Sequence, residues 1–338
     1  MRAPTSANKY SEDILSDPMF QKIYAIGFPE RTDKHDAITM GSSITGFDIS
    51  WVDAVHPESI PLRARPPGIE RLTPEEVGCW RAHMNIMQII VANHVTTALI
   101  FEDDADWDIL LKDQLSGFAY GAQAIQGQTG SAISPYGDAW DMLWLGHCGI
   151  SSREDGQTFY VLPNDPTVRP DHHKDEFWAP SIASKPEVPA SSRLVFHSSG
   201  GACTAAYAIS YNGAQKILNA LSMTQVTQPV DLAYQLMCKS RELPNFTCIA
   251  PYPQIISSWR PAGPSYRDSD IRTGDDTWHD AFSKGIVFST MLNLKRIIAG
   301  ESTVTAQWTD VQTREVRLNE SGIIKGHLVS VEPDKMDK

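Results

Sequence analysis

The stretch Thr97-Ala-Leu-Ile-Phe-Glu-Asp-Asp104 decides how the rest of the sequence is interpreted. A short apolar segment predicts a buried strand, and it runs directly into three carboxylates. Because acids inside a buried strand are costly, we place them at its carboxyl end, the edge where open α/β sheets bind ligands. Neighbouring carboxylates repel one another, so the run indicates a divalent cation with oxygen ligands, Mg²⁺ or Mn²⁺. The alternative is a solvated acidic loop that caps the next helix.

Strands and helices are expected to alternate around this segment. The best helix prediction covers 72–94, where Thr73 and Glu76 form a capping box and Pro74 occupies the first helical position. Further strands are expected at 22–28, 47–55, 140–145 and 203–210, and further helices after Glu30, at 214–221, from Pro229 and at 291–299. This alternation predicts an α/β fold with a mostly parallel central sheet flanked by helices.

The domain organisation follows from composition along the chain. We expect a flexible N-terminal segment at 1–19, one catalytic domain at 20–300 and a polar C-terminal tail at 301–338. Within the domain, 149–196 is rich in Pro, Ser, Asp and His and predicts a long loop on the acceptor side of the site.

The overall charge excludes two classes of partner. The 338 residues include 29 Lys plus Arg and 41 Asp plus Glu, which gives a net charge of −12. Duplex nucleic acids and anionic membranes both require a basic face, so neither is an expected partner. No stretch approaches the roughly 20 apolar residues of a membrane span. An anionic substrate is still compatible with this chain if a metal or a local basic cluster binds it.

Several side chains are candidates for chemistry, each with a plainer alternative. Arg31 and Lys34 follow the first strand and would suit a nucleotide phosphate, or would form an ordinary exposed helical turn. His83 would serve a site or be a satisfied polar residue of its helix. Asp231, at a helix start, would be a general base or a helix cap.

The pair His172-His173, near Asp171 and Asp175, has the composition of a metal site. Adjacent histidines do not face the same way on a regular element. We therefore expect these residues to form a solvated loop.

Taken together, the segments resemble glycosyltransferase family 25, which includes bacterial lipopolysaccharide and procollagen galactosyltransferases. The family pattern Leu-x-x-Gly-Glu-x-Gly-Cys-x-x-Ser-His, followed by a strand ending in Glu-Asp-Asp, is similar to Leu72–His83 and Leu99–Asp104. Later motifs correspond to Trp140–Gly146, Ala206–Ala214, Pro229–Asp231 and Ser269-Asp270. His147-Cys148-Gly149 and Cys203-Thr204 look most like the fungal branch.

The resemblance implies a GT-A-type nucleotide-diphospho-sugar transferase fold, Mn²⁺ and a UDP-sugar donor, usually UDP-galactose. It implies transfer with inversion to a hydroxyl of a glycan or glycoprotein acceptor, by a β-galactosyltransferase. It also implies a place in the lumen of the Golgi or ER, as a catalytic domain without its N-terminal membrane anchor. The alternatives are an inactive homologue that binds UDP or a UDP-sugar, and a metal-dependent phosphoester hydrolase.

Residue roles carry over by position. The resemblance implies that Asp104 is the metal ligand, with Glu102 as a second ligand or donor contact and Asp103 as a donor contact. Asp270, Asp268 or water would complete the metal site. The remaining positions are Arg31, Lys34, Asp53 and His83 for the donor and Asp231 as the base that takes the acceptor proton.

The sequence departs from the family pattern at Gly27, Ala82 and Ser258-Trp259, the last of which leaves the third metal ligand open. In the luminal compartment that the resemblance implies, disulfides are expected. We predict Cys238–Cys248 and Cys148–Cys203, with Cys79 free in the core.

Overall fold

The structure is a computed structural model that describes residues 19–127, 132–153, 157–174, 177–240, 245–272, 274–311, 313, 315–318 and 326–331. The expected N-terminal segment 1–19 lies outside this part, apart from its last residue. None of the helices within these residues combines the length and the apolar character that a membrane span requires.

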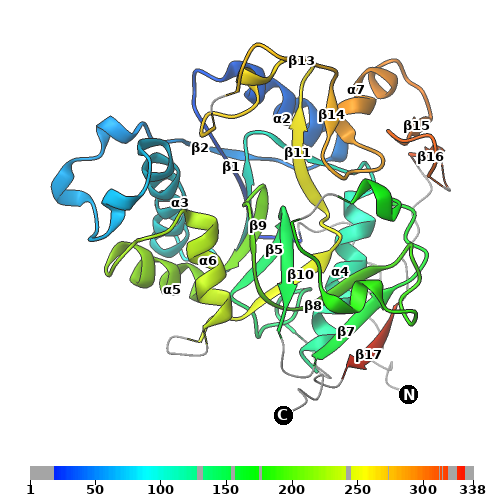
Figure 1. Ribbon diagram of the computed structural model, residues 1–338, viewed down its shortest axis with the longest axis horizontal. Helices are drawn as coiled ribbons and strands as arrows, with labels where there is room; N and C mark the ends of the chain where they lie inside the picture. Colours follow the sequence, from blue (N-terminus) through cyan, green and yellow to red (C-terminus); the bar gives the residue numbers. More distant parts are fainter. Residues whose placement is uncertain are drawn as a thin grey trace, which may run out of the picture.

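One large sheet organises the molecule (Figure 1). Its strands are β1 (Lys22–Gly27), β2 (Ser50–Asp53), β3 (Thr97–Glu102), β5 (Met142–Gly146), β6 (Gly149–Ser152), β7 (Gln157–Leu162), β8 (Arg193–Ala202), β9 (Ala206–Ser210), β10 (Cys248–Tyr252) and β17 (His327–Val331). Among the described residues their order is β17-β7-β8-β10-β5-β9-β3-β1-β2, with β6 beside β8.

The sheet is mixed, and the expectation of a mostly parallel sheet was wrong. Strand β1 pairs in parallel with β2 and β3, and β5 pairs in parallel with β10. The pairings of β9 with β3 and β5, and of β8 with β6, β7 and β10, are antiparallel. Parallel neighbours need a crossover of a dozen residues or more, usually a helix. No α-helix separates β6, β7 and β8 in the described chain, which accounts for the antiparallel pairing of β6 and β7 with β8.

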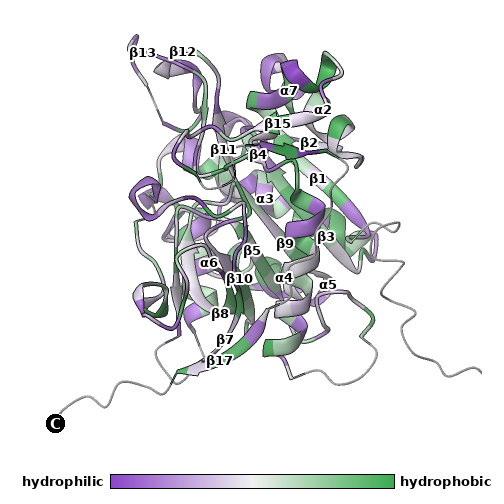
Figure 2. Cartoon of the chain, turned by 90° about the vertical axis from the view of Figure 1, so that its right-hand side faces the viewer, coloured by the Kyte–Doolittle hydropathy of each residue, from purple (hydrophilic) through white to green (hydrophobic). Residues whose placement is uncertain are grey.

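Helices cover both faces of the sheet. They are α2 (Thr32–Thr45), α3 (Pro74–Ala92), α4 (Leu111–Ile125), α5 (Tyr211–Ser222), α6 (Val230–Lys239) and α7 (Thr290–Ile298). Helices α3, α5 and α6 share one apolar core with the sheet, and α2, α4 and α7 share the other. Successive strand residues alternate between the two cores: Ile100 faces the first and Phe101 the second. Figure 2 shows hydrophobic residues concentrated along the central strands.

The sequence-predicted helix at 72–94 is confirmed as α3. Its capping box is present, with the Thr73 side chain accepting from the Glu76 amide and the Glu76 carboxylate accepting from the Thr73 amide. Trp80, Met84 and Met87 are buried on its apolar face.

The segments expected to be a loop and a tail both carry strands. Strands β6 and β7 and the start of β8 lie within 149–196, and β17 from the C-terminal segment pairs with β7 at the edge of the main sheet. Smaller sheets join β4 (Ala105–Trp107), β11 (Ile256–Arg260) and β14 (Phe282–Ser283), β12 (Gly263–Pro264) with β13 (Trp278–His279), and β15 (Thr303–Thr305) with β16 (Glu315–Arg317).

Both predicted disulfides are present. Cys148 bonds to Cys203, and Cys238 bonds to Cys248. Cys79 is free, as expected, but it is only partly buried, because it packs against the first core and also lines a pocket.

Candidate functional site

A pocket of about 420 Å³ opens at the carboxyl ends of β1 and β3. These parallel neighbours end at the same edge of the sheet, so the acidic run after β3 and the turn after β1 come together. The segment 54–58, helix α3 and residues 269–271 complete the walls. Of the sequence-predicted site residues, the pocket collects Arg31, Lys34, His83, Glu102, Asp103, Asp104 and Asp270.

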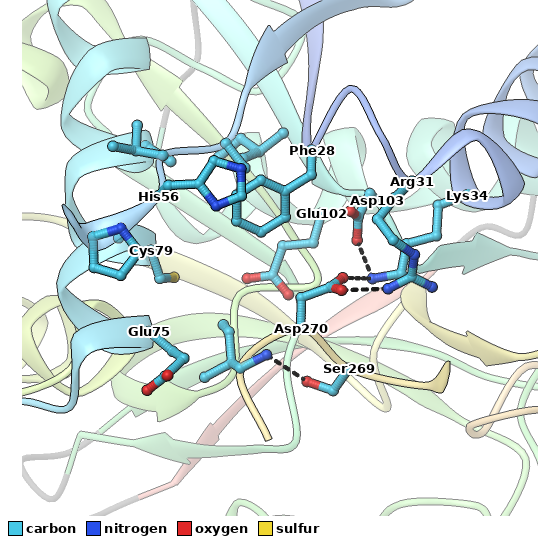
Figure 3. Close-up of a pocket in the computed structure, with 18 of the residues that line it drawn as sticks. Phe28, Arg31, Lys34, His56, Glu75, Cys79, Glu102, Asp103, Ser269 and Asp270 are labelled. Atoms are coloured by element: carbon cyan, nitrogen blue, oxygen red, sulfur yellow. Dashed lines mark hydrogen bonds and ion pairs between the residues drawn. The ribbon is translucent and has the colours of Figure 1, made fainter. Parts of the chain in front are cut away.

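Lys34 links two acids from distant parts of the chain. Its Nζ lies 2.7 Å from Asp103 Oδ1 and 2.6 Å from Asp270 Oδ2. Burial alone would lower the Lys34 pKa, but the charges of Asp103 and Asp104 outweigh it, so the pKa is raised and the amine stays protonated. Arg31 pairs with Asp270 as well. Figure 3 shows the Asp270 carboxylate pointing toward these two cations.

Asp103 is the most perturbed acid of the site. Burial raises its pKa to about 7, with Lys34 opposing the rise and Asp104 adding to it. Gly27 packs against it: a Cβ at position 27 would lie 3.0 Å from Asp103 Cβ and 2.9 Å from the Trp51 ring. The glycine at position 27 therefore leaves room for this carboxylate.

Asp104 is paired with Arg260, a residue that sequence reasoning missed. Strand β11 carries Arg260 to the site, because it pairs with β4 and the Trp259 amide donates to the Asp104 carbonyl at 2.7 Å. Asp268 lies 3.9 Å from the same guanidinium and 3.1 Å from His279 Nε2. The arginine at the end of the short strand Ile256–Arg260 was the signal for Arg260, but only the fold reveals its partner.

A buried chain of polar groups supports Glu102. The Thr204 hydroxyl donates to Glu102 Oε1 at 2.6 Å. His83 Nε2 lies 3.8 Å from the same oxygen, and His83 Nδ1 lies 2.6 Å from the Tyr207 hydroxyl. His83 is only 1% exposed and lines the pocket behind Glu102.

Two sequence-predicted residues do not line this pocket. Asp53 ends β2 but is exposed. Asp231 lies at the start of α6, where its carboxylate accepts from the amides of Cys203 at 2.9 Å and Leu232 at 2.8 Å. These bonds brace the turn after β8 and hold the Asp231 carboxylate in a fixed orientation.

The kinds of ligand atom at this pocket suit a hard divalent cation, because Glu102, Asp104 and Asp270 all offer carboxylate oxygens there. The acids are not gathered around a common point, however. Among the described residues, the group of three ligand atoms within 4.8 Å of one another is His172, His173 and Asp310, elsewhere in the fold. A metal at the pocket would have to take Asp104 from Arg260.

The fold and the pocket thus define an α/β protein with a cation-lined acidic site at the carboxyl edge of its sheet. No family model matches the chain. It is similar to procollagen galactosyltransferase 1-A of Xenopus laevis, with 23% identity over 238 residues that cover 65% of this chain. The chain spans 31% of that protein's length. This similarity supports a glycosyltransferase-like relationship; assignment to family 25, its fungal branch and the GT-A fold remain predictions.

Proposed function

We propose that the protein is a glycosyltransferase that moves galactose from UDP-galactose to a hydroxyl group of a glycan or glycoprotein acceptor. The observation that carries the proposal is the acidic run Glu102-Asp103-Asp104 beside Arg31 and Lys34 in one pocket, in a chain distantly similar to a galactosyltransferase. Two disulfides fit an oxidising compartment such as the secretory lumen.

The charge arrangement supports binding of a metal diphosphate. Asp104 and Asp270 are neutralised by protein cations, Arg260 for the first and Arg31 with Lys34 for the second. The diphosphate of a UDP-sugar carries two negative charges, which one divalent cation balances. The metal and the diphosphate can therefore bind together by replacing the ion pairs of the free pocket. The protein cations then pair with the phosphates, and the carboxylates bind the metal.

In this proposal Mn²⁺ is held by Asp104 with Glu102 or Asp270, and when bound it stabilises the charge of the departing diphosphate. Arg31 and Lys34 bind the diphosphate. Phe28 and His56, whose ring centroids lie 4.5 Å apart at the pocket, offer an aromatic wall for the base. Asp231 is the proposed base for the acceptor proton.

The decisive experiment measures UDP release from a panel of UDP-sugars, with and without Mn²⁺ and with candidate acceptors. We expect metal-dependent release from UDP-galactose, reduced at least about 100-fold in Asp104→Asn. Asp48→Asn is the matched control, because Asp48 is exposed, does not line the pocket and has no assigned role. Release from no UDP-sugar, or an unchanged rate in Asp104→Asn, would refute the proposal.

One observation favours a second candidate, a UDP-binding homologue without turnover: Arg260 already occupies the Asp104 carboxylate. That protein would bind UDP in the absence of metal and release none from UDP-galactose. Hydrolysis of a simple phosphate ester without any acceptor would instead indicate the phosphoesterase alternative.

A further inference from the structure

A second polar cluster joins the segment after β7 to the segment after β15. His172 and His173 belong to the 3-10 turn η4 (Asp171–His173), and both face Asp310. His172 Nε2 lies 2.5 Å from Asp310 Oδ2, and His173 Nε2 lies 2.9 Å from Asp310 Oδ1. A solvated loop was expected here, and His172 is indeed exposed, but the tight turn also brings the two ring centroids within 4.2 Å of each other. Asp175, the other acid of this stretch, lies outside the described residues.

The position of His173 is fixed from two sides. Its carbonyl accepts from Nε of Arg169 at 2.9 Å, and Arg169 is 1% exposed and also donates to the Gly285 carbonyl at 2.8 Å. The imidazole stacks on Trp308, with centroids 4.7 Å apart and planes within 16°. Backbone and ring are therefore both held, so that Nε2 keeps its direction toward Asp310.

We propose that His172, His173 and Asp310 form a zinc site that clips the segment after β7 to the C-terminal segment. Two imidazole nitrogens and one carboxylate oxygen are ligands that Zn²⁺ favours. In a tetrahedral site, ligand atoms bound at about 2.0–2.1 Å from the metal lie roughly 3.3 Å apart. The two His–Asp separations need to open only slightly, and the three ligand atoms all lie within 4.8 Å of one another. Water takes the fourth position because His172 is 66% exposed.

The clip is independent of the proposed donor site. None of its three residues lines the pocket at β1 and β3. It closes 137 residues of chain between His173 and Asp310, so bound metal would restrain the segment that the sequence placed on the acceptor side. Its test therefore does not depend on glycosyl transfer.

The test uses the full chain, stripped with a chelator and dialysed against micromolar Zn²⁺, with bound metal measured by elemental analysis. We expect His172→Asn and Asp310→Asn each to lose one equivalent of zinc relative to the parent protein. Asp310→Glu should keep that equivalent because it retains a carboxylate. His327→Asn is the matched control, because His327 is an exposed histidine in β17 outside the cluster.

Asp104→Asn distinguishes zinc bound at the clip from zinc bound at the acidic pocket. This variant should keep the equivalent that His172→Asn loses. Zinc should also raise the Tm of the parent protein, and His172→Asn should lose this rise, because binding to the folded state alone stabilises it. His172 is well exposed, so its substitution leaves folding intact, which circular dichroism verifies. Equal zinc content in the parent, His172→Asn and Asp310→Asn would overturn the proposal, as would no binding by the parent.

Discussion

Arg260 makes an ion pair with Asp104, the carboxylate that ends the acidic run after β3. Both side chains are largely buried, at 13% and 16% exposure, so solvent screens the pair little. Burial would lower the Arg260 pKa, but the Asp104 charge raises it above its usual value, so the guanidinium remains charged. In the proposed enzyme, Arg260 competes with the metal for this oxygen.

Replacing Arg260 with Gln should therefore strengthen metal binding at Asp104. A charged hydrogen bond contributes roughly 1.5–3 kcal/mol, so the Mn²⁺ concentration for half-maximal UDP release should fall about tenfold or more. The matched control is Arg267→Gln, because Arg267 is 44% exposed and lies 3.8 Å from its acidic partner Asp33. Loss of all turnover in Arg260→Gln at saturating Mn²⁺ would instead mean that the guanidinium replaces the metal.

Local sequence determines the elements around this site, and the sequence therefore predicts them well. Helix α3 begins where Thr73, Pro74 and Glu76 predict, because a capping box acts within one turn. The acidic run lies at the carboxyl end of β3 for an equally local reason: the apolar residues before it form a buried strand. Both disulfides followed once the resemblance implied an oxidising compartment.

Contacts between segments that are distant in the chain could not be predicted from sequence patterns. Arg260 meets Asp104 across 156 residues, and His172 meets Asp310 across 138. Neither pair has a spacing that a periodicity could reveal. The direction of β9 is a similar case, because an apolar strand has the same pattern whether its neighbours are parallel or antiparallel.

Lys34 should contribute to stability as well as to donor binding. Its Nζ is the partner of both Asp103 and Asp270, and Lys34→Met would leave these acids facing each other across a buried site. Removing one member of a buried ion pair typically costs 3–5 kcal/mol, so we expect the free energy of unfolding to fall by about 3 kcal/mol in urea titrations. Glu301→Gln, which breaks the exposed Arg296–Glu301 pair, should cost less than about 1 kcal/mol. Equal losses in the two variants would contradict the role of Lys34.

His147 should make the protein sensitive to acid. Its Nε2–H donates to the Pro251 carbonyl at 2.9 Å, and burial lowers its pKa to about 4, with Arg169 and Arg193 contributing. An unfolded histidine has a pKa of about 6.5, so between these values the unfolded chain binds more protons than the folded one. Stability should therefore fall as the pH drops from about 6.5 to 4, by roughly 3 kcal/mol in total from this residue.

The measurement is the free energy of unfolding at several pH values in the parent protein and in His147→Gln. Glutamine can still donate to the Pro251 carbonyl but does not titrate, so its curve should be flatter between pH 6.5 and 4. Other buried groups, such as Asp108 with a pKa of about 7, are present in both proteins and cancel in the difference. Parallel curves would show that the pKa of His147 is the same in the folded and unfolded states, which would contradict the prediction.

The two disulfides should differ in what they contribute. In the chain-entropy model a crosslink stabilises by restricting the unfolded chain, more for a longer loop. Cys148–Cys203 closes 55 residues and Cys238–Cys248 closes 10, which predicts about 4 and about 3 kcal/mol. The first bond also fixes the turn whose Cys203 amide donates to Asp231 at 2.9 Å. Cys148→Ser with Cys203→Ser should therefore lower both stability and turnover, whereas Cys238→Ser with Cys248→Ser should lower stability alone.

Urea unfolding and UDP release on the two double variants check both parts of this prediction. Thiol labelling of the denatured, unreduced parent protein should modify Cys79 alone. Labelling of all five cysteines would show that neither disulfide forms and would refute the prediction. If both double variants lose turnover in proportion to stability, the Cys148–Cys203 bond acts only by holding the fold together. A loss of turnover confined to the Cys148–Cys203 variant would tie the orientation of Asp231 to the chemistry, because that bond holds the amide on which the carboxylate rests.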